Sequence, residues 1–154
     1  MATTFRSDTV AAVRTVLAAQ ITATPTQLRK VYNSWPSGVA ETPCAFIGNR
    51  SERIRYTGQT RTRELVGLEV HIIDTLVDAA ETDDRMDDLV DLLVDRFTAA
   101  YNAVSGGGGL LQLTSVTDTL LTLPRPNGGD VIYRDAVLGF GDPANPTFIM
   151  EGRA

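Results

Sequence analysis

Residue types that carry out nucleophilic or acid–base chemistry are few in this sequence. His71 is the only histidine and Cys44 the only cysteine. His71 lies on a predicted strand beside Glu69 with no serine or cysteine nearby, so acid–base work would need partners from distant parts of the chain. Cys44 stands in an apolar run, which is typical of a small buried hydrophobe. We therefore expect both residues to be structural, and we predict no disulfide, no catalytic residue and no cofactor.

Four consecutive glycines, Gly106–Gly109, have the composition of a phosphate-binding loop. They follow a predicted helix and lead into Leu110 without the Lys-Ser/Thr pair that such a loop needs to hold a nucleotide. We interpret the run as a helix stop and a flexible connection.

Aspartate dominates the first half of the helix predicted from about Glu81 to Val104. Four aspartates recur every three or four residues and so project from the side opposite the apolar stripe: Asp84, Asp88, Asp91 and Asp95. The ligand spacing of a calcium loop is missing, and no histidine interleaves as in di-iron bundles, so we predict no metal site. A solvated face is one interpretation, and a contact face for a basic partner is the other.

Arginine is concentrated on a predicted β-hairpin that turns at Thr57-Gly58-Gln59. Four arginines have the same parity on its two strands, so we expect all four side chains on one face: Arg53, Arg55, Arg61 and Arg63. Binding to nucleic acid is one interpretation, because arginine contacts phosphates well. The net charge of −5, the absence of a recognisable reading motif and the single interleaved aromatic, Tyr56, stand against it. Pairing with the acidic helix of a neighbouring copy and a merely exposed hairpin are the alternatives.

Charge is segregated along the chain. Residues 1 to 63 hold nine basic and three acidic residues, a net charge of +6, whereas residues 64 to 154 hold five and sixteen, a net charge of −11. One surface of a copy can then match a different surface of the next, which favours head-to-tail contacts.

The hydrophobic pattern predicts a single α+β domain over residues 1–141, because the 154-residue chain is of the length expected for one core. Helices are predicted from Ser7 or Asp8 to Ile21 and over 81–104. Strands are predicted over residues 28–32, 43–47, 53–56, 60–73, 110–123 and 131–140. Strand and helix do not alternate regularly, so we expect a mixed, mainly antiparallel sheet with two helices packed on one face and a long β-hairpin.

The remaining residues, 142–154, are expected to form an extended C-terminal tail. The tail carries an apolar cluster, Phe148-Ile149-Met150, with no predicted element of its own. Such a cluster would be a liability if exposed, so we expect it to dock on a neighbouring subunit or on a partner protein.

No stretch approaches the ~20 apolar residues that a membrane span requires. The first residues lack the charged-then-apolar pattern of a signal peptide. These two features predict a chain made in the cytosol with no membrane partner.

Several segments together carry a resemblance that covers nearly the whole chain. They are the opening helix at Asp8–Ile21, Val31-Tyr32 with the following Pro36 loop, Pro43–Gly48, Arg53–Tyr56, the strand Glu64–Val70 and the helix start Asp84–Leu89. In this order they resemble the tail terminator or tail completion proteins of long-tailed, siphovirus-like bacteriophages.

The resemblance implies a structural virion protein of the tail–neck region, assembled in the host cytoplasm. Proteins of that family form a ring, typically of six subunits, on the last ring of the tail tube, stop tube polymerisation and present a surface to the head–tail connector. DNA passes through the lumen without specific binding, and the family brings no catalytic residues. The expected partners are therefore copies of this chain, a tail tube protein and connector or neck proteins.

The expected subunit and partner contacts fall on the hairpin arginines, the four helix aspartates and the apolar cluster of the tail. A head-completion or neck adaptor protein is the nearest alternative. A small nucleic-acid-binding module that uses the arginine hairpin is the alternative from another class.

Overall fold

The computed structural model describes residues 5–23, 27–39, 41–76, 79–103, 112–125, 127–141 and 148–153. The helices are α1 (Phe5–Thr22) and α2 (Ala79–Ala103). The strands are β1 (Lys30–Tyr32), β2 (Cys44–Thr57), β3 (Thr60–Thr75), β4 (Leu113–Pro124), β5 (Asp130–Phe140) and β6 (Phe148–Arg153). The strands form one sheet of order β1-β2-β3-β5-β4, with β6 paired to β3. The expected α+β class is confirmed.

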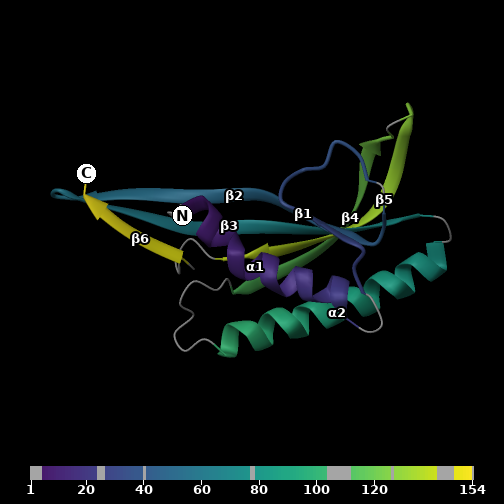
Figure 1. The fold of residues 1–154 in the computed structure, drawn as a ribbon, viewed down its shortest axis with the longest axis horizontal. Helices are drawn as coiled ribbons and strands as arrows, with labels where there is room; N and C mark the ends of the chain where they lie inside the picture. The colour runs from purple at the N-terminus through teal and green to yellow at the C-terminus, as the bar shows by residue number, and fades with distance from the viewer. Residues whose placement is uncertain are drawn as a thin grey trace.

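Strand β3 is the centre of the sheet. It pairs with β2 along one edge and with β5 and then β6 along the other, all antiparallel, whereas β1 pairs with β2 in parallel. β5 covers Leu68–Thr75 of β3, and β6 covers Thr60–Leu65. The outer half of the β2–β3 hairpin with β6 projects from the body, and we call it the arm (Figure 1).

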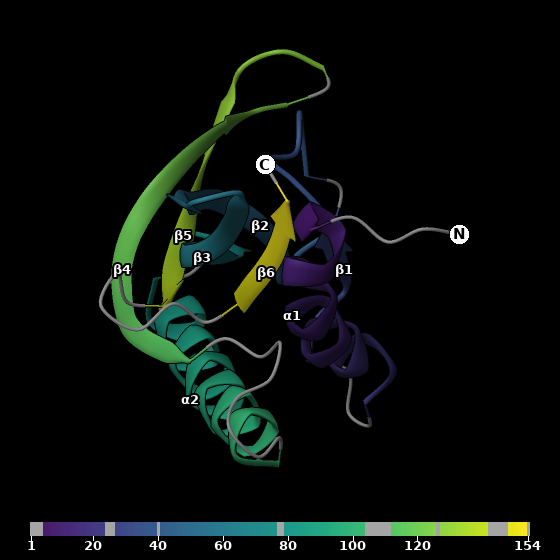
Figure 2. The ribbon, with the colours of Figure 1, turned by 90° about the vertical axis from the view of Figure 1, so that its left-hand side faces the viewer.

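Both helices pack on the same face of the sheet, which we call the helix face (Figure 1 and Figure 2). The buried stripes of α1 and α2 meet inward side chains of the central strands in one core: Val10, Val13, Leu17, Met86, Leu89, Leu93, Phe97, Leu68, Val70, Ile72, Ala136, Leu138 and Phe140. Leu17 and Leu93 have no exposed surface, and burying a leucine side chain contributes about 2 kcal/mol. The helical periodicity predicted from sequence is thereby confirmed for both helices.

The opposite face of the sheet has a smaller core. It is formed by Cys44, Phe46, Ile73, Leu123 and Tyr133. Burial raises the pKa of the Cys44 thiol to about 12, with a smaller contribution from the Asp74 carboxylate. The thiol is protonated at neutral pH, as expected for a structural cysteine.

The sequence-based division of β2 into two strands is wrong. The structure has a single strand from Cys44 to Thr57, with a shift of register between Ile47 and Arg50. This is a β-bulge, in which one extra residue is accommodated without ending the strand. Gly48 within it lies against the His71 ring, where a Cβ would come within 2.8 Å of the ring carbon Cδ2. The glycine that reads as a strand end in the sequence is therefore a point of close packing.

A second bulge lies in β3, where Ser51 pairs with Gly67 and Glu52 with Leu65, so that Val66 is the extra residue. The bulge reverses the alternation, and Leu65 joins Leu68 in the helix-face core. Simple alternation along the strand would place Val66 with Leu68, Val70 and Ile72, but the bulge leaves only the last three in that core.

The prediction that the C-terminal tail has no element of its own is also wrong. Its residues Phe148–Arg153 form β6, and Phe148 pairs with Leu65 of β3. β5 ends just before Gly141, whose backbone lies against the carbonyl of Val66 at the bulge. β5 does not pair with the Thr60–Leu65 part of β3, and β6 pairs with that part of the edge instead.

Candidate assembly surfaces

The register of the β2–β3 hairpin separates the four predicted arginines. The strands continue to Thr57 and Thr60, which pair, so only Gly58 and Gln59 form the turn, with Gly58 at φ 60°. With a two-residue turn, residues of the same parity on the two strands project from opposite faces. Arg61 and Arg63 therefore lie on the helix face, and Arg53 and Arg55 lie on the opposite face. The expectation of one arginine face is wrong, because it assumed a three-residue turn.

Two glutamates of the arm form ion pairs with these arginines. Arg53 Nε lies 2.6 Å from Glu64 Oε2, and Arg55 Nε lies 3.6 Å from the same oxygen. On the helix face, Arg63 Nη2 lies 2.5 Å from Glu52 Oε2. Glu64 is buried, whereas Arg53 and Arg63 stay partly exposed. The ion pairs orient the arginines along the arm and reduce its net positive charge.

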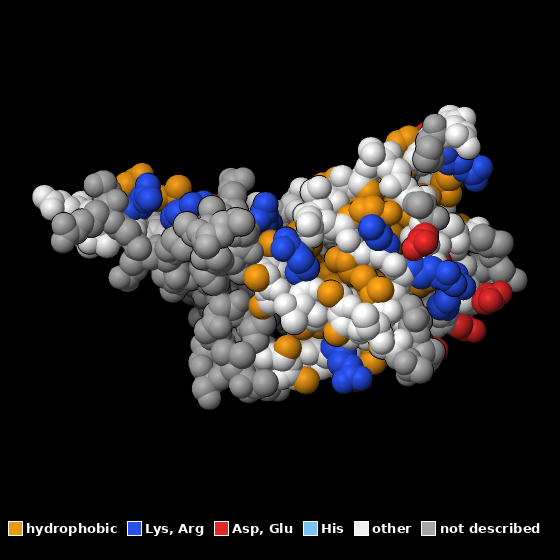
Figure 3. All heavy atoms as spheres, viewed as in Figure 1, with side chains coloured by type: hydrophobic (Ala, Val, Ile, Leu, Met, Phe, Trp, Pro, Cys, Tyr) orange, Lys and Arg blue, Asp and Glu red, His pale blue; other side chains and the backbone are white. Residues whose placement is uncertain are grey.

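Two large apolar side chains are exposed on the arm beside arginine. Ile54 is 50% exposed and Tyr56 is 67% exposed, and their direct partners in the hairpin are Arg63 and Arg61. Directly opposed residues share a face, so these four side chains form one surface, which we call the arm-tip face. Figure 3 shows hydrophobic and basic side chains together along the arm.

The four predicted helix aspartates do share an exposed side of α2. Asp84, Asp88, Asp91 and Asp95 are exposed, opposite the buried stripe that includes Leu89. The acidic first half of α2 lies at the end of the molecule away from the arm (Figure 1 and Figure 3). The chain therefore does not bring its arginine hairpin and its acidic helix together within one copy.

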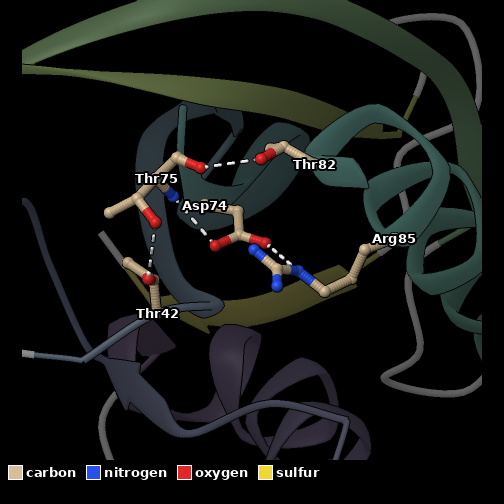
Figure 4. Close-up of polar contacts among 5 residues, drawn as sticks. All are labelled: Thr42, Asp74, Thr75, Thr82 and Arg85. Carbon is tan, nitrogen blue, oxygen red and sulfur yellow. Dashed lines mark hydrogen bonds and ion pairs between the residues drawn. The ribbon is translucent and has the colours of Figure 1, made fainter. Parts of the chain in front are cut away.

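The start of α2 is tied to the end of β3 by polar contacts (Figure 4). Asp74 is fully buried and accepts hydrogen bonds from Arg85 Nε at 2.5 Å and from the Thr75 backbone N–H at 2.8 Å. Thr82 Oγ1 donates to the Thr75 carbonyl at 3.0 Å, and the hydroxyls of Thr75 and Thr42 lie 3.5 Å apart. These contacts fix where the acidic half of the helix lies on the sheet.

A further apolar surface lies on β4 and β5 and was not predicted. Val116, Leu120 and Ile132 are 43%, 58% and 51% exposed. Val116 pairs with Leu138, a residue of the helix-face core, and the two-residue alternation places all three on the helix face. We call these three residues the β4 patch. The sequence predicts a strand here but does not show which of its residues another element covers.

His71 is buried, as expected of a structural histidine. Its ring stacks on Phe46 with centroids 4.7 Å apart and contacts Trp35 at 4.8 Å. Nδ1 lies 2.8 Å from Asp135 Oδ2, and Nε2 lies 3.5 Å from Glu69 Oε2. The sequence analysis missed Asp135, because it comes from β5 and only the strand register places it beside His71.

A histidine held by a buried carboxylate can transfer protons only where a reacting group reaches its free nitrogen. Nε2 is buried within the packed face of the sheet and has no hydrogen-bond partner among the described residues. In the described part of the chain, no group of three or more His, Cys, Asp or Glu side chains is placed to hold a metal ion. The arrangement is that of a packed polar pair in a core.

Two predicted features extend beyond what the structure describes. The glycine run Gly106–Gly109 lies outside the described residues. The backbone of Phe148, Ile149 and Met150 pairs with Leu65, Glu64 and Arg63 of the same chain, whereas their side chains are outside the described set. Docking of this cluster on a neighbour stays a prediction.

Sequence comparisons assign no family to the chain. No protein-family model matches it, and a search of curated proteins finds no match. None of the helices in the described ranges is long and apolar enough to cross a membrane.

Proposed function

We propose that the protein is a structural virion protein that assembles head to tail into a ring, caps the tail tube of a long-tailed phage and ends tube polymerisation. The ring then presents its other surface to the head–tail connector. The observation that carries this proposal is the separation of two unlike surfaces on one chain, a basic arm and the acidic exposed side of α2 at the far end (Figure 3). Unlike surfaces of this kind pair between copies, and a rotation that closes gives a ring.

The fold suits such a role because its body is rigid and its arm projects. The two helices and the sheet share one continuous core. The arm extends from that body as a three-stranded segment of β2, β3 and β6. A rigid body can act as a wedge of the ring, and a projecting arm can reach the next wedge.

The charge distribution supports passage of DNA through such a ring without specific binding. The chain has a net charge of −5, and exposed aspartates extend along the outer side of α2. An acidic or neutral wall does not retain a polyanion, whereas a strongly basic wall would.

The arrangement of the arginines weighs against a nucleic-acid-binding module. A phosphate-binding face needs several cations on one surface, but the hairpin divides its four between two faces. Glu64 and Glu52 also pair with Arg53 and Arg63.

The experiment that tests the proposal offers the purified chain three targets: polymerising tail tubes, DNA-filled heads and free duplex DNA. We expect electron micrographs to show rings at one end of the tubes and no salt-dependent binding to free DNA. Binding to filled heads alone would replace the terminator with the neck adaptor. Binding to free DNA that is lost on Arg53→Ala and Arg55→Ala would favour the nucleic-acid module.

A further inference from the structure

The β4 patch has acidic side chains around its apolar centre. Asp118 lies between Val116 and Leu120 on the same face of β4 and is exposed. Leu120 pairs directly with Arg134, and Arg134 Nε lies 3.0 Å from Asp83 Oδ1 on α2. This ion pair places the acidic start of α2 alongside the patch.

The same flank of α2 continues the acidic edge. Asp87 follows Asp83 by one helical turn, so the two side chains lie on one side of the helix, and Asp87 is exposed. The β4 patch is therefore an apolar surface with Asp118 within it and Asp83 and Asp87 beside it.

The arm-tip face has the complementary composition. Ile54 and Tyr56 provide its apolar centre, and Arg61 and Arg63 lie directly across the hairpin from them. Aromatic and arginine side chains contribute most of the energy of many protein interfaces, particularly where they enter an apolar centre. The apolar centres match each other, and the exposed Arg61 matches the exposed Asp118 and Asp87.

We propose that the arm-tip face of one copy docks on the β4 patch of the next copy. This inference rests on the proposed function, since it names the contact that builds the ring. The arm tip and the patch lie far apart on one chain, so each copy offers one surface to a neighbour on either side (Figure 1). Contacts between unlike surfaces of identical copies propagate head to tail and close when the rotation allows.

Disulfide cross-linking tests which residues meet. A chain carrying Tyr56→Cys and Leu120→Cys is oxidised with and without tail tubes, and the products are separated under non-reducing conditions. Cys44 is buried and does not compete. We expect a ladder of cross-linked copies that ends at the closed ring.

A matched control uses Arg55→Cys with Leu120→Cys. Arg55 is exposed and adjacent to Tyr56, but it projects from the other face of the arm. We expect the chain that carries these two cysteines to remain monomeric under the same conditions. Equal ladders from both variants would overturn the assignment of the arm-tip face.

Charge reversal tests the same contact without introducing cysteine. Arg61→Glu and Asp118→Arg are each expected to weaken association between copies at least about tenfold, because each places like charges together. The chain with both changes should regain most of that loss, since every contact then pairs the reversed charges. Failure of the double variant to recover, with both single variants folded, would contradict the pairing.

The outcomes separate this contact from the proposed function. Capped tubes without a cross-link between positions 56 and 120 would overturn the contact and leave the terminator function standing. A cross-linked ladder from a chain that never binds tubes would support the contact and reject the terminator function. A chain that caps no tube and forms no ladder would overturn both.

Discussion

Replacing Asp74 by alanine tests how much the buried Asp74 carboxylate stabilises the junction between β3 and α2 that Figure 4 shows. Asp74 is fully buried and accepts from Arg85 Nε and from the Thr75 N–H. Its removal leaves the Thr75 N–H without this acceptor, which costs about 1–3 kcal/mol. Arg85 is nearly half exposed and can turn to water, so its loss adds little. We expect the free energy of unfolding to fall by about 1–3 kcal/mol in all.

Urea denaturation followed by circular dichroism measures this change, with Asp84→Ala as the matched control. Asp84 lies on the exposed side of the same helix, and substitutions at such positions usually change stability by less than about 0.5 kcal/mol. For a chain of this length, the Asp74→Ala loss corresponds to a fall in Tm of about 3–10 °C. An Asp74→Ala variant as stable as Asp84→Ala would refute the view that the buried Asp74 carboxylate stabilises this junction.

A double-mutant cycle with Arg85→Ala isolates the ion pair itself. Groups in direct contact typically couple by about 0.5–3 kcal/mol. We expect the loss from the double change to be smaller than the sum of the two single losses. Additive losses would mean that Asp74 acts through the Thr75 N–H alone.

Four other predictions concern the packing. Gly141→Ala should destabilise the chain by more than Gly128→Ala in thermal unfolding: both glycines have positive φ, but only at Gly141 would a Cβ meet backbone, 2.9 Å from a carbonyl oxygen. The Cys44 thiol, whose pKa is raised to about 12, should react with iodoacetamide at pH 8 only when the chain is unfolded; rapid labelling of the folded chain would contradict its burial. Because the pKa of Cys44 is raised on folding, the buried thiol contributes to stability below about pH 9, and this contribution is lost as the pH rises toward 12. A series of unfolding curves at increasing pH measures the loss. Leu93→Ala should lower the free energy of unfolding by about 2–5 kcal/mol, because the side chain is fully buried between α2 and the sheet; a loss below 1 kcal/mol would contradict that packing.

The helices and the fold class could be predicted because each depends on local periodicity. The apolar stripe of α2 follows the helical repeat, and the alternation in β3 follows the repeat of a strand. The edge of the sheet formed by β6 could not be predicted in this way, because a strand of six residues becomes identifiable only when its partner on β3 is known.

The arginine surface was predicted wrongly because one residue more or less in the turn changes which face of the hairpin each arginine lies on. Three turn residues would have placed Arg53 and Arg61 on one face, whereas the observed two place them on opposite faces.

The β4 patch was missed because exposure is not a local property of the strand. Whether Leu120 is buried depends on which elements cover the sheet, and the sequence of the strand does not contain that information.

Asp135 was missed as the partner of His71 because the two are separated by 64 residues. Neither residue lies in a sequence motif, and the strand pairing of β3 with β5 brings them together. The sequence predicted a structural histidine, but only the register places the buried Asp135 carboxylate beside it.

The central claim is that copies of this chain close into a ring that stops tube growth. The most direct measurement follows tail tube polymerisation by light scattering, with purified chain added during growth at a small molar fraction of the tube protein. The account predicts that elongation stops early, and that electron micrographs then show short tubes with one ring at the growing end. Tubes that continue to lengthen at the same rate, with no ring at either end, would contradict it.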